Sequence, residues 1–546
     1  MKAFGLFLVL LLIAAGALAF RLPRLKQRPM HVDEAVQAFK FGELHDKWYY
    51  RYDPKEFHGP TLNYVTLPLA YLGTAEGRSY AQTDEFTYRI VPVIFGVATV
   101  VLLVLLAEGL GWGAVFVAAV LTAISPAMVF YSRYYIHETL LVCFTLGFIG
   151  AAWQYTRAKH RRWALLAGAF LALMFATKET FVIALIAMAI GCFCTSAWDR
   201  WVSGDEAAWH KMAHLLPDWK ALLGAVVVAC VISGVLFSSF FTNAQGPLDA
   251  IQTFTTYAQR AGQELHRHPW DFYLRRLFFF RDDSGPLWSE GLIGFLALAG
   301  FVAALIGKGI PAERRSLARF LGFYTVALIT GYSMIGYKTP WCALSFLHGM
   351  ILLAGVGAVV LLKAMPNTAT KAIAAILLVA AAGHLGWQAY RASYKYYADP
   401  RNPWVYAHTG TDMANFERRV EELARVHPDG HDMLVKVVTR DYWPVPWYMR
   451  RFSRLGYWHE PPEDSDAPLI VSAPDVEAAL GRALKGKYHK EYFGSRPEVF
   501  LQLYVDAGLW DEFVKSRSAP AAAPKSAPPA QNKPGETKNA RPVIEP

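Results

Sequence analysis

Apolar runs of roughly 18 residues or more recur through the first 390 positions of the chain, and each is long enough to cross a bilayer as a helix. Only 18% of the 546 residues are charged, whereas about a quarter are charged in a typical soluble protein. The sequence therefore predicts an all-α polytopic membrane protein with about 11 transmembrane helices.

The limits of the predicted spans follow from where each apolar run begins and ends. They cover approximately residues 3–20, 88–108, 112–130, 136–155, 162–177, 180–197, 219–241, 288–306, 318–336, 341–362 and 371–389.

The orientation of the chain follows from Lys and Arg in short loops, which prefer the cytoplasmic side. With the N-terminus in the cytoplasm, the basic clusters at 157–162, 308–319 and 363–371 all fall in cytoplasmic loops. Four basic residues just outside the first span break this rule, and we keep them as candidate contacts of a lipid phosphate: Arg21, Arg24, Lys26 and Arg28.

The first span also resembles a cleavable signal peptide, because Lys2 and an apolar core precede Ala17-Leu18-Ala19. We expect it to stay as a membrane helix, since the apolar run is long enough to span. The five cysteines lie in apolar stretches without a disulfide or zinc spacing, which favours buried thiols.

Three larger pieces lie outside the membrane in this topology: the loop 21–87, the loop 242–287 and the region after about 390. We expect residues 1–390 to form the transmembrane domain, with 21–87 as its first outer loop. Residues 391–516 are predicted to form a small extracytoplasmic α/β domain, with strands at 433–439, 468–472 and 498–505 and a helix at 476–484. Residues 517–546 are rich in Pro, Ala, Lys and Ser, which predicts a disordered tail.

Two aromatic segments invite a functional interpretation. We interpret the aromatics at 48–52 as an interfacial belt rather than a sugar platform. The cluster at 441–448 is typical of a packed strand-to-helix turn, with an acceptor-binding surface as the alternative.

Polar residues in or near membrane helices cost free energy, so such residues often mark a functional site. With the predicted topology, the conspicuous ones all fall on the outer side, which predicts one polar cavity at the outer mouth of the bundle. They are His31, Asp33, Glu34, His58, Arg89, Arg133, Tyr134, His137, Glu138, Lys178, Glu179 and Lys338.

This set of residue types suits the transfer of a sugar from a lipid phosphate. A carboxylate can act as general base, fixed cations stabilise phosphate charge in a dry site, and aromatic faces suit sugar rings and isoprenoid tails. A phosphate leaving group is already acidic, so one carboxylate is sufficient, whereas a glycoside hydrolase needs a second carboxyl group as acid.

Each residue also has a structural interpretation that the sequence leaves open. Asp33 and Glu34 could be solvated loop charges. Arg133 and Lys178 could be long side chains reaching from helix ends to the interface, and His137 with Glu138 could cap a helix.

The same residues carry a resemblance to a known family. The acidic pair Asp33-Glu34, Arg89 at the start of the second span, and Ser132-Arg133-Tyr134-Tyr135-Ile136-His137-Glu138 are its marks. On these, residues 1–390 resemble the dolichyl-phosphate-mannose protein mannosyltransferase-like (PMT-like) superfamily, which has the multi-span glycosyltransferase-C (GT-C) fold. Within it, the chain looks closest to the prokaryotic flippase-associated PMT-like group.

The resemblance implies an inverting transfer from a polyprenyl-phosphate sugar to a protein, lipid or glycan acceptor at the outer face of a prokaryotic plasma membrane. Asp33 matches the acidic residue that activates the acceptor, which would make 21–87 the catalytic loop. Glu34 beside it is a further catalytic candidate, and Glu138 matches a second acidic position. His58-Gly59-Pro60 stands where relatives carry Lys before prolines, facing the donor phosphate. The other candidate contacts of that phosphate are Arg89, Arg133, Lys178 and Lys338.

The resemblance leaves a divalent metal open, because relatives differ in whether they need one. His31, His58, His137 and Glu138 could supply ligands, although no spacing demands it.

Two other functions fit the same polar residues. A transporter or lipid flippase would carry internal repeats and charges near the bilayer midplane, but we find no clear repeat, and the charges lie at helix ends. A non-catalytic flippase-associated partner that binds a lipid-linked glycan would need similar contacts. No nucleic-acid motif accompanies the net charge of +10.

Overall fold

The computed structural model describes residues 2–55, 58–72, 78–210, 217–260 and 266–518. By internal contacts, these residues form two compact units. The first, here the membrane unit, holds the described residues of 1–26, 40–77 and 84–406. The second, here the C-terminal unit, holds those of 27–39, 78–83 and 407–546.

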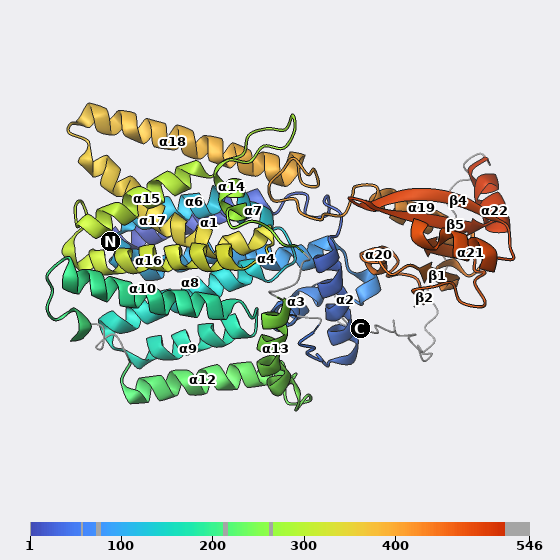
Figure 1. The fold of residues 1–546 in the computed structure, drawn as a ribbon, viewed down its shortest axis with the longest axis horizontal. Coiled ribbons are helices and arrows are strands. Elements are labelled where there is room, and N and C mark those ends of the chain that lie inside the picture. Colours follow the sequence, from blue (N-terminus) through green and yellow to red (C-terminus); the bar gives the residue numbers. More distant parts are fainter. Residues whose placement is uncertain (1, 56–57, 73–77, 211–216, 261–265, 519–546) are drawn as a thin grey trace. The chain divides into compact units, whose positions relative to one another are not determined.

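Long helices make up most of the membrane unit, and they run side by side (Figure 1). Each of the eleven predicted spans overlaps one of them, and the predicted fold class is confirmed. The helices are α1 (Lys2–Arg21), α4 (Glu85–Leu102), α6 (Trp112–Ile124), α8 (Glu138–Ala158), α9 (Arg161–Phe175), α10 (Phe181–Trp201), α12 (Trp219–Phe237), α15 (Gly291–Ile306), α16 (Ala312–Met334), α17 (Ala343–Ala364) and α18 (Thr368–Tyr390).

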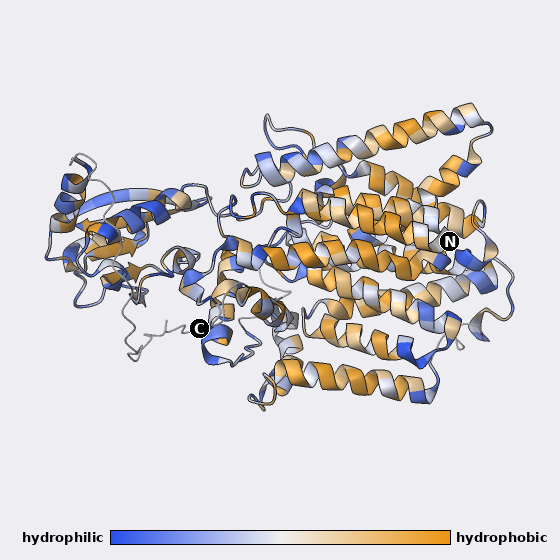
Figure 2. Ribbon diagram, turned by 180° about the vertical axis from the view of Figure 1, so that it is seen from behind, coloured by the Kyte–Doolittle hydropathy of each residue, from blue (hydrophilic) through white to orange (hydrophobic). Residues whose placement is uncertain are grey.

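In the described part of the chain, seven helical segments are long and apolar enough to cross a membrane. These segments differ sharply in burial. In Pro340–Ala364, which contains α17, 78% of the apolar window is buried, whereas in α12 only 11% of the apolar window is buried. Figure 2 shows that much of the length of these helices is apolar, with hydrophilic residues near several of their ends. Helix α17 is therefore the centre of the bundle, while α12 exposes its apolar side chains to lipid.

Close packing at the bundle centre depends on glycine. A Cβ atom on Gly357 of α17 would lie 1.9 Å from the carbonyl oxygen of Leu296 on α15. A Cβ atom on Gly300 of α15 would lie 2.2 Å from the carbonyl oxygen of Leu353. The two helices touch through their backbones here, as small residues allow in membrane proteins.

The predicted span 112–130 was wrong as a single helix. Helix α6 ends at Ile124, and α7 (Pro126–Tyr131) starts beyond Ser125, because Pro126 has no N–H to continue the helical hydrogen bonds. The Glu290 carboxylate accepts hydrogen bonds from the Ser125 hydroxyl (2.6 Å) and the Ala127 N–H (2.9 Å), so it closes the break.

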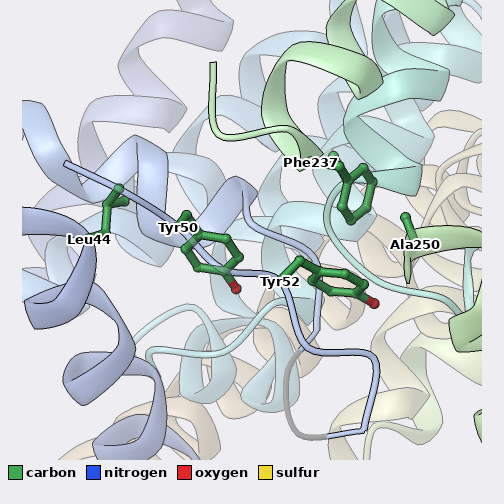
Figure 3. Close-up of a cluster of buried hydrophobic side chains, with 6 residues drawn as sticks. Leu44, Tyr50, Tyr52, Phe237 and Ala250 are labelled. Atoms are coloured by element: carbon green, nitrogen blue, oxygen red, sulfur yellow. The ribbon is translucent and has the colours of Figure 1, made fainter. Parts of the chain in front are cut away.

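Shorter helices connect the spans: α2 (Val32–Lys47), α3 (Thr61–Ala70), α13 (Gly246–Arg260) and α14 (Phe272–Phe278). A buried cluster fixes the loop after α2 to this part of the unit (Figure 3). Tyr50 and Tyr52 pack there with Leu44, Phe237 and Ala250. The interfacial-belt prediction was therefore wrong for these two tyrosines, although Trp48 is exposed.

The C-terminal unit contains a five-stranded sheet in the order β2-β1-β3-β5-β4. Strands β2, β1 and β3 are parallel, whereas β5 and β4 run antiparallel. The elements are α19 (Met413–Val426), β1 (Leu434–Val438), α20 (Val445–Tyr448), β2 (Arg454–Trp458), β3 (Leu469–Ser472), α21 (Glu477–Ala483), β4 (Tyr488–Arg496), β5 (Val499–Asp506) and α22 (Ala507–Ser518).

The three predicted strands correspond to β1, β3 and β5, and the predicted helix corresponds to α21. Strands β2 and β4 were not predicted. The domain limits at 390 and 516 stay predictions, and residues 519–546 of the predicted tail lie outside the described residues.

Candidate functional site

The predicted acidic pair lies in the first turn of α2, where its two carboxylates differ sharply. Glu34 is fully buried, and it accepts hydrogen bonds from the His31 N–H (3.1 Å) and from Arg28 (3.3 Å). The Asp33 side chain is 47% exposed. Glu34 is thus bound within the fold, while Asp33 is accessible from outside.

His31 completes this arrangement from the other side. Its Nδ1 accepts a hydrogen bond from the Asp33 N–H (3.0 Å). The His31 side chain thus bonds a backbone N–H inside the helix, while the Glu34 side chain bonds the backbone N–H of His31. The pattern resembles a capping box, but histidine takes the place of Ser or Thr and accepts from the second helical residue instead of the third. The ring of His31 is buried and lies edge-on to His408, with ring centroids 5.0 Å apart.

In the membrane unit, two predicted site residues form a buried ion pair. Glu138 opens α8, Lys178 lies in the turn between α9 and α10, and their side chains are only 5% and 7% exposed. The pair brings together two segments that the sequence placed at the same end of the bundle. In an environment without water, removal of one partner would leave the other as a buried charge without compensation, which destabilises the fold.

Beside this pair lies a second contact between predicted residues, His58 and Glu179. The His58 Nδ1 and the Glu179 Oε2 are 2.9 Å apart, and the Tyr52 hydroxyl donates to the other carboxylate oxygen at 3.4 Å. Burial opposes ionisation of Glu179, but the charge and hydrogen bond of His58, with the charge of Lys178, hold the pKa of Glu179 below its usual value. Glu179 is therefore a carboxylate near neutral pH.

His137 packs edge-on against His58, with ring centroids 5.1 Å apart. Its Nε2 lies 3.2 Å from the Gly59 carbonyl oxygen, which only accepts, so Nε2 carries the proton. Burial, and then the nearby His58 and Lys178, push the pKa of His137 well below its ordinary value. His137 is consequently neutral and holds the Gly59 backbone.

The predicted guanidinium groups bind backbone carbonyls. Arg133 donates to the carbonyl oxygens of Arg21, Pro23 (2.9 Å) and Arg24 (3.4 Å) and stacks on Tyr394, 4.4 Å from the ring centroid. Its guanidinium therefore holds the chain where α1 ends, a position at which helical carbonyls lack partners.

Arg21 and Arg89 hold the same region. The buried Arg21 donates to Ser132 Oγ (2.8 Å) and to the carbonyl oxygens of Thr122 and Ala123 at the end of α6 (2.9 Å each). Arg89 donates to the Leu25 carbonyl oxygen at 2.7 Å.

The other basic residues after the first span have different surroundings. Lys26 forms an ion pair with Asp84 at 2.5 Å, and Arg28 pairs with Glu34. Arg24 is exposed. Of these four candidate contacts of a lipid phosphate, Arg21 is the most deeply buried.

Lys338 and Tyr134 also lie inside the fold. The Lys338 ammonium donates to the His268 carbonyl oxygen (3.0 Å) and to that of Ile335, and burial lowers its pKa. Tyr134 is buried against Trp341, with ring centroids 6.1 Å apart.

The geometry joins Glu138 with Lys178, and His58 with Glu179 and His137. It does not collect a metal site: in the described ranges, no three His, Cys, Asp or Glu side chains gather as they would around an ion. Tyr52 and Glu290 make buried hydrogen bonds that the sequence did not reveal, because each bonds a residue more than 100 positions away.

Comparison with known proteins agrees with the fold. Residues 61–244 match the family model of dolichyl-phosphate-mannose-protein mannosyltransferases. No curated protein sequence matches the chain. Among solved structures, ArnT from Cupriavidus metallidurans bound to undecaprenyl phosphate is similar over 91% of this chain and 98% of its own, at 15% identity and a TM-score of 0.62.

The apo oligosaccharyltransferase of Archaeoglobus fulgidus is similar over 93% of this chain and 77% of its own, at 14% identity and a TM-score of 0.52. The resemblance predicted from Asp33-Glu34, Arg89 and the segment 132–138 is confirmed by the family model over residues 61–244, and the fold of this chain is similar to that of ArnT and of the oligosaccharyltransferase.

Proposed function

We propose that this protein is an inverting glycosyltransferase that moves a sugar from a polyprenyl-phosphate donor to a protein, lipid or glycan acceptor. The family match and the GT-C fold support a glycosyltransferase. The ArnT structure is described as bound to undecaprenyl phosphate, which makes a polyprenyl-phosphate donor the natural choice for this chain. The proposal puts transfer at the extracytoplasmic face of a prokaryotic plasma membrane, with the N-terminus in the cytoplasm, as the basic loops predict.

One observation carries the choice of base: Asp33 is 47% exposed, whereas the adjacent Glu34 is fully buried and bonded. A general base must reach the hydroxyl group that it deprotonates. Asp33 takes the proton of an acceptor hydroxyl, whose oxygen forms a bond to the anomeric carbon from the face opposite the phosphate. The bond from that carbon to the phosphate oxygen breaks, and the lipid phosphate leaves with the electron pair.

His58 is the proposed contact of the donor phosphate. Its side chain is 27% exposed, whereas Lys178, Arg133, Arg89 and Lys338 are nearly fully buried. A Glu179 carboxylate oxygen lies 2.9 Å from the His58 Nδ1 and orients the ring.

The experiment that tests the base compares Asp33→Asn with Asp46→Asn. Asp46 lies in the last turn of the same helix, and its side chain is also 47% exposed, so the second variant is a matched control. The donor is the polyprenyl-phosphate sugar fraction of the native membranes, labelled by growth on radioactive glucose, and the acceptor is native membrane.

Asp33→Asn should abolish transfer of label out of the lipid fraction while binding of undecaprenyl phosphate, measured by native mass spectrometry, is retained. Asp46→Asn should keep both. Full transfer by Asp33→Asn would overturn the proposed base. Movement of labelled lipid across vesicles without any transfer would instead favour the flippase.

A further inference from the structure

The start of α2 depends on His31 in an unusual way. His31 is the residue before the helix, since its carbonyl oxygen accepts the first helical hydrogen bond from the Ala35 N–H at 2.8 Å. Residues at this position usually bear a hydroxyl, amide or carboxylate oxygen that accepts from the first-turn N–H groups. Here the acceptor is the Nδ1 atom of the imidazole, 3.0 Å from the Asp33 nitrogen.

This hydrogen bond fixes the state of the ring. A nitrogen that accepts a hydrogen bond has its lone pair available, so Nδ1 is unprotonated and the neutral ring carries its proton on Nε2. The Asp33 Oδ2 lies 4.0 Å from the same Nδ1. His31 therefore touches both the backbone and the carboxylate region of the residue that we assign as base.

The segment around His31 belongs to the C-terminal unit and is hydrogen-bonded to it. The Met30 N–H donates to the Tyr448 hydroxyl (3.0 Å), and the Thr409 hydroxyl donates to the Met30 carbonyl oxygen (2.7 Å). The ring of His31 packs on that of His408. The imidazole thus has little freedom, and the orientation that it imposes on the first turn is well defined.

We propose that His31 is a positioning residue, which caps α2 through Nδ1 and thereby sets the direction of the Asp33 carboxylate. This inference rests on the proposed function, in which Asp33 is the base. Asp33 is the second residue of the helix, so its side chain points where the first turn directs it. If the first turn frays, the helix remains but the carboxylate loses its direction.

The test uses three substitutions in the full-length protein. Asn carries its Oδ1 where the imidazole carries Nδ1, and Asn is among the best residues at this position. Gln carries its oxygen one bond further out, and Ala carries no acceptor. Since misplacing a catalytic group by about 1 Å costs on the order of 100-fold in rate, His31→Gln and His31→Ala should lower kcat by roughly 10- to 100-fold.

His31→Asn should stay within a few-fold of the wild-type kcat, and all three variants should keep the wild-type KM for the labelled lipid donor. A lower kcat at an unchanged KM distinguishes positioning from a merely structural role. Loss of folded protein would lower the yield of a variant, but it would not lower the kcat of the molecules that remain folded. Hydrogen exchange at the Asp33 amide should be faster in His31→Gln than in His31→Asn.

The chain offers a matched control in His427. Its Nδ1 accepts from the backbone N–H of Asp429, two residues on, at 3.1 Å, which is the same contact at a place remote in sequence from Asp33. His427→Gln should leave kcat unchanged.

The outcomes separate this inference from the proposed function. Absence of transfer by the wild-type protein, or full transfer by Asp33→Asn, would overturn the proposed function. If Asp33→Asn abolishes transfer while His31→Gln is as fast as wild type, only the positioning role fails. It also fails if His31→Asn loses as much kcat as His31→Ala, a comparison that holds even when His31→Gln does not accumulate.

Discussion

The buried ion pair of Glu138 and Lys178 offers the sharpest test of how the membrane unit is held together. Both side chains are less than a tenth exposed. Glu138→Gln leaves the Lys178 ammonium buried without its carboxylate partner, and breaking a buried pair on one side costs about 3–5 kcal/mol. The free energy of unfolding should fall by about that amount.

A double variant distinguishes a charge effect from loss of packing. Glu138→Gln combined with Lys178→Met removes both charges, so it should be more stable than Glu138→Gln alone. The exposed pair of Arg157 and Glu108, with side chains 44% and 62% exposed, is the matched control, and Glu108→Gln should cost about 0–1 kcal/mol.

SDS-driven unfolding in mixed micelles measures these differences. If Glu138→Gln lowers the free energy of unfolding by less than about 1 kcal/mol, the pair contributes no more than an exposed ion pair does. The single variant Lys178→Met completes the comparison. If the double variant loses as much stability as Glu138→Gln and Lys178→Met lose in sum, the two charges do not interact. Either result would refute the reasoning.

Three further expectations follow from described contacts. The pKa of Glu179 is lowered on folding, so its ionisation contributes stability that is present above the ordinary pKa of a glutamate and is lost as the pH falls through the lower pKa of the folded state. Glu179→Gln should therefore flatten this acid limb in unfolding curves measured against pH. Gly357→Ala, whose Cβ would meet the Leu296 carbonyl oxygen, should cost about 1–3 kcal/mol in mixed-micelle unfolding, whereas Gly383→Ala, with nothing within 4 Å, should have no such effect. Arg133→Lys should lower the unfolding temperature, because one ammonium cannot replace a guanidinium that donates to several carbonyls.

The membrane helices could be predicted because a long apolar run has few alternatives in a chain of this kind. The break at Ser125 was missed because the apolar run continues past Pro126, although this proline, which has no N–H, was a signal in the sequence that could have revealed it. Strand β4 was missed because its residues, from Tyr488 to Arg496, are mostly polar, and half-exposed strands give a weak signal.

For the candidate site, residue types and their places in the chain could be predicted, but their partners could not. The resemblance points to Asp33 as the base, but the sequence does not show that Glu34 is buried, because that burial depends on how Arg28 and His31 fold back. Arg133 has the residue type of a phosphate contact, yet its hydrogen bonds go to the end of α1. Such choices are made by tertiary contacts between distant segments.

The break between α6 and α7 has a consequence for how this protein is made. The carboxylate that closes the break belongs to Glu290, which follows Ala127 by 163 residues. A ribosome therefore delivers the break to the membrane long before its acceptor exists. Until then the Ala127 N–H and the Ser125 hydroxyl must find temporary partners, in water or elsewhere in the chain. Chains truncated before residue 290 should thus leave residues 124–127 accessible to labelling reagents, so that final folding of the early helices awaits the arrival of α15.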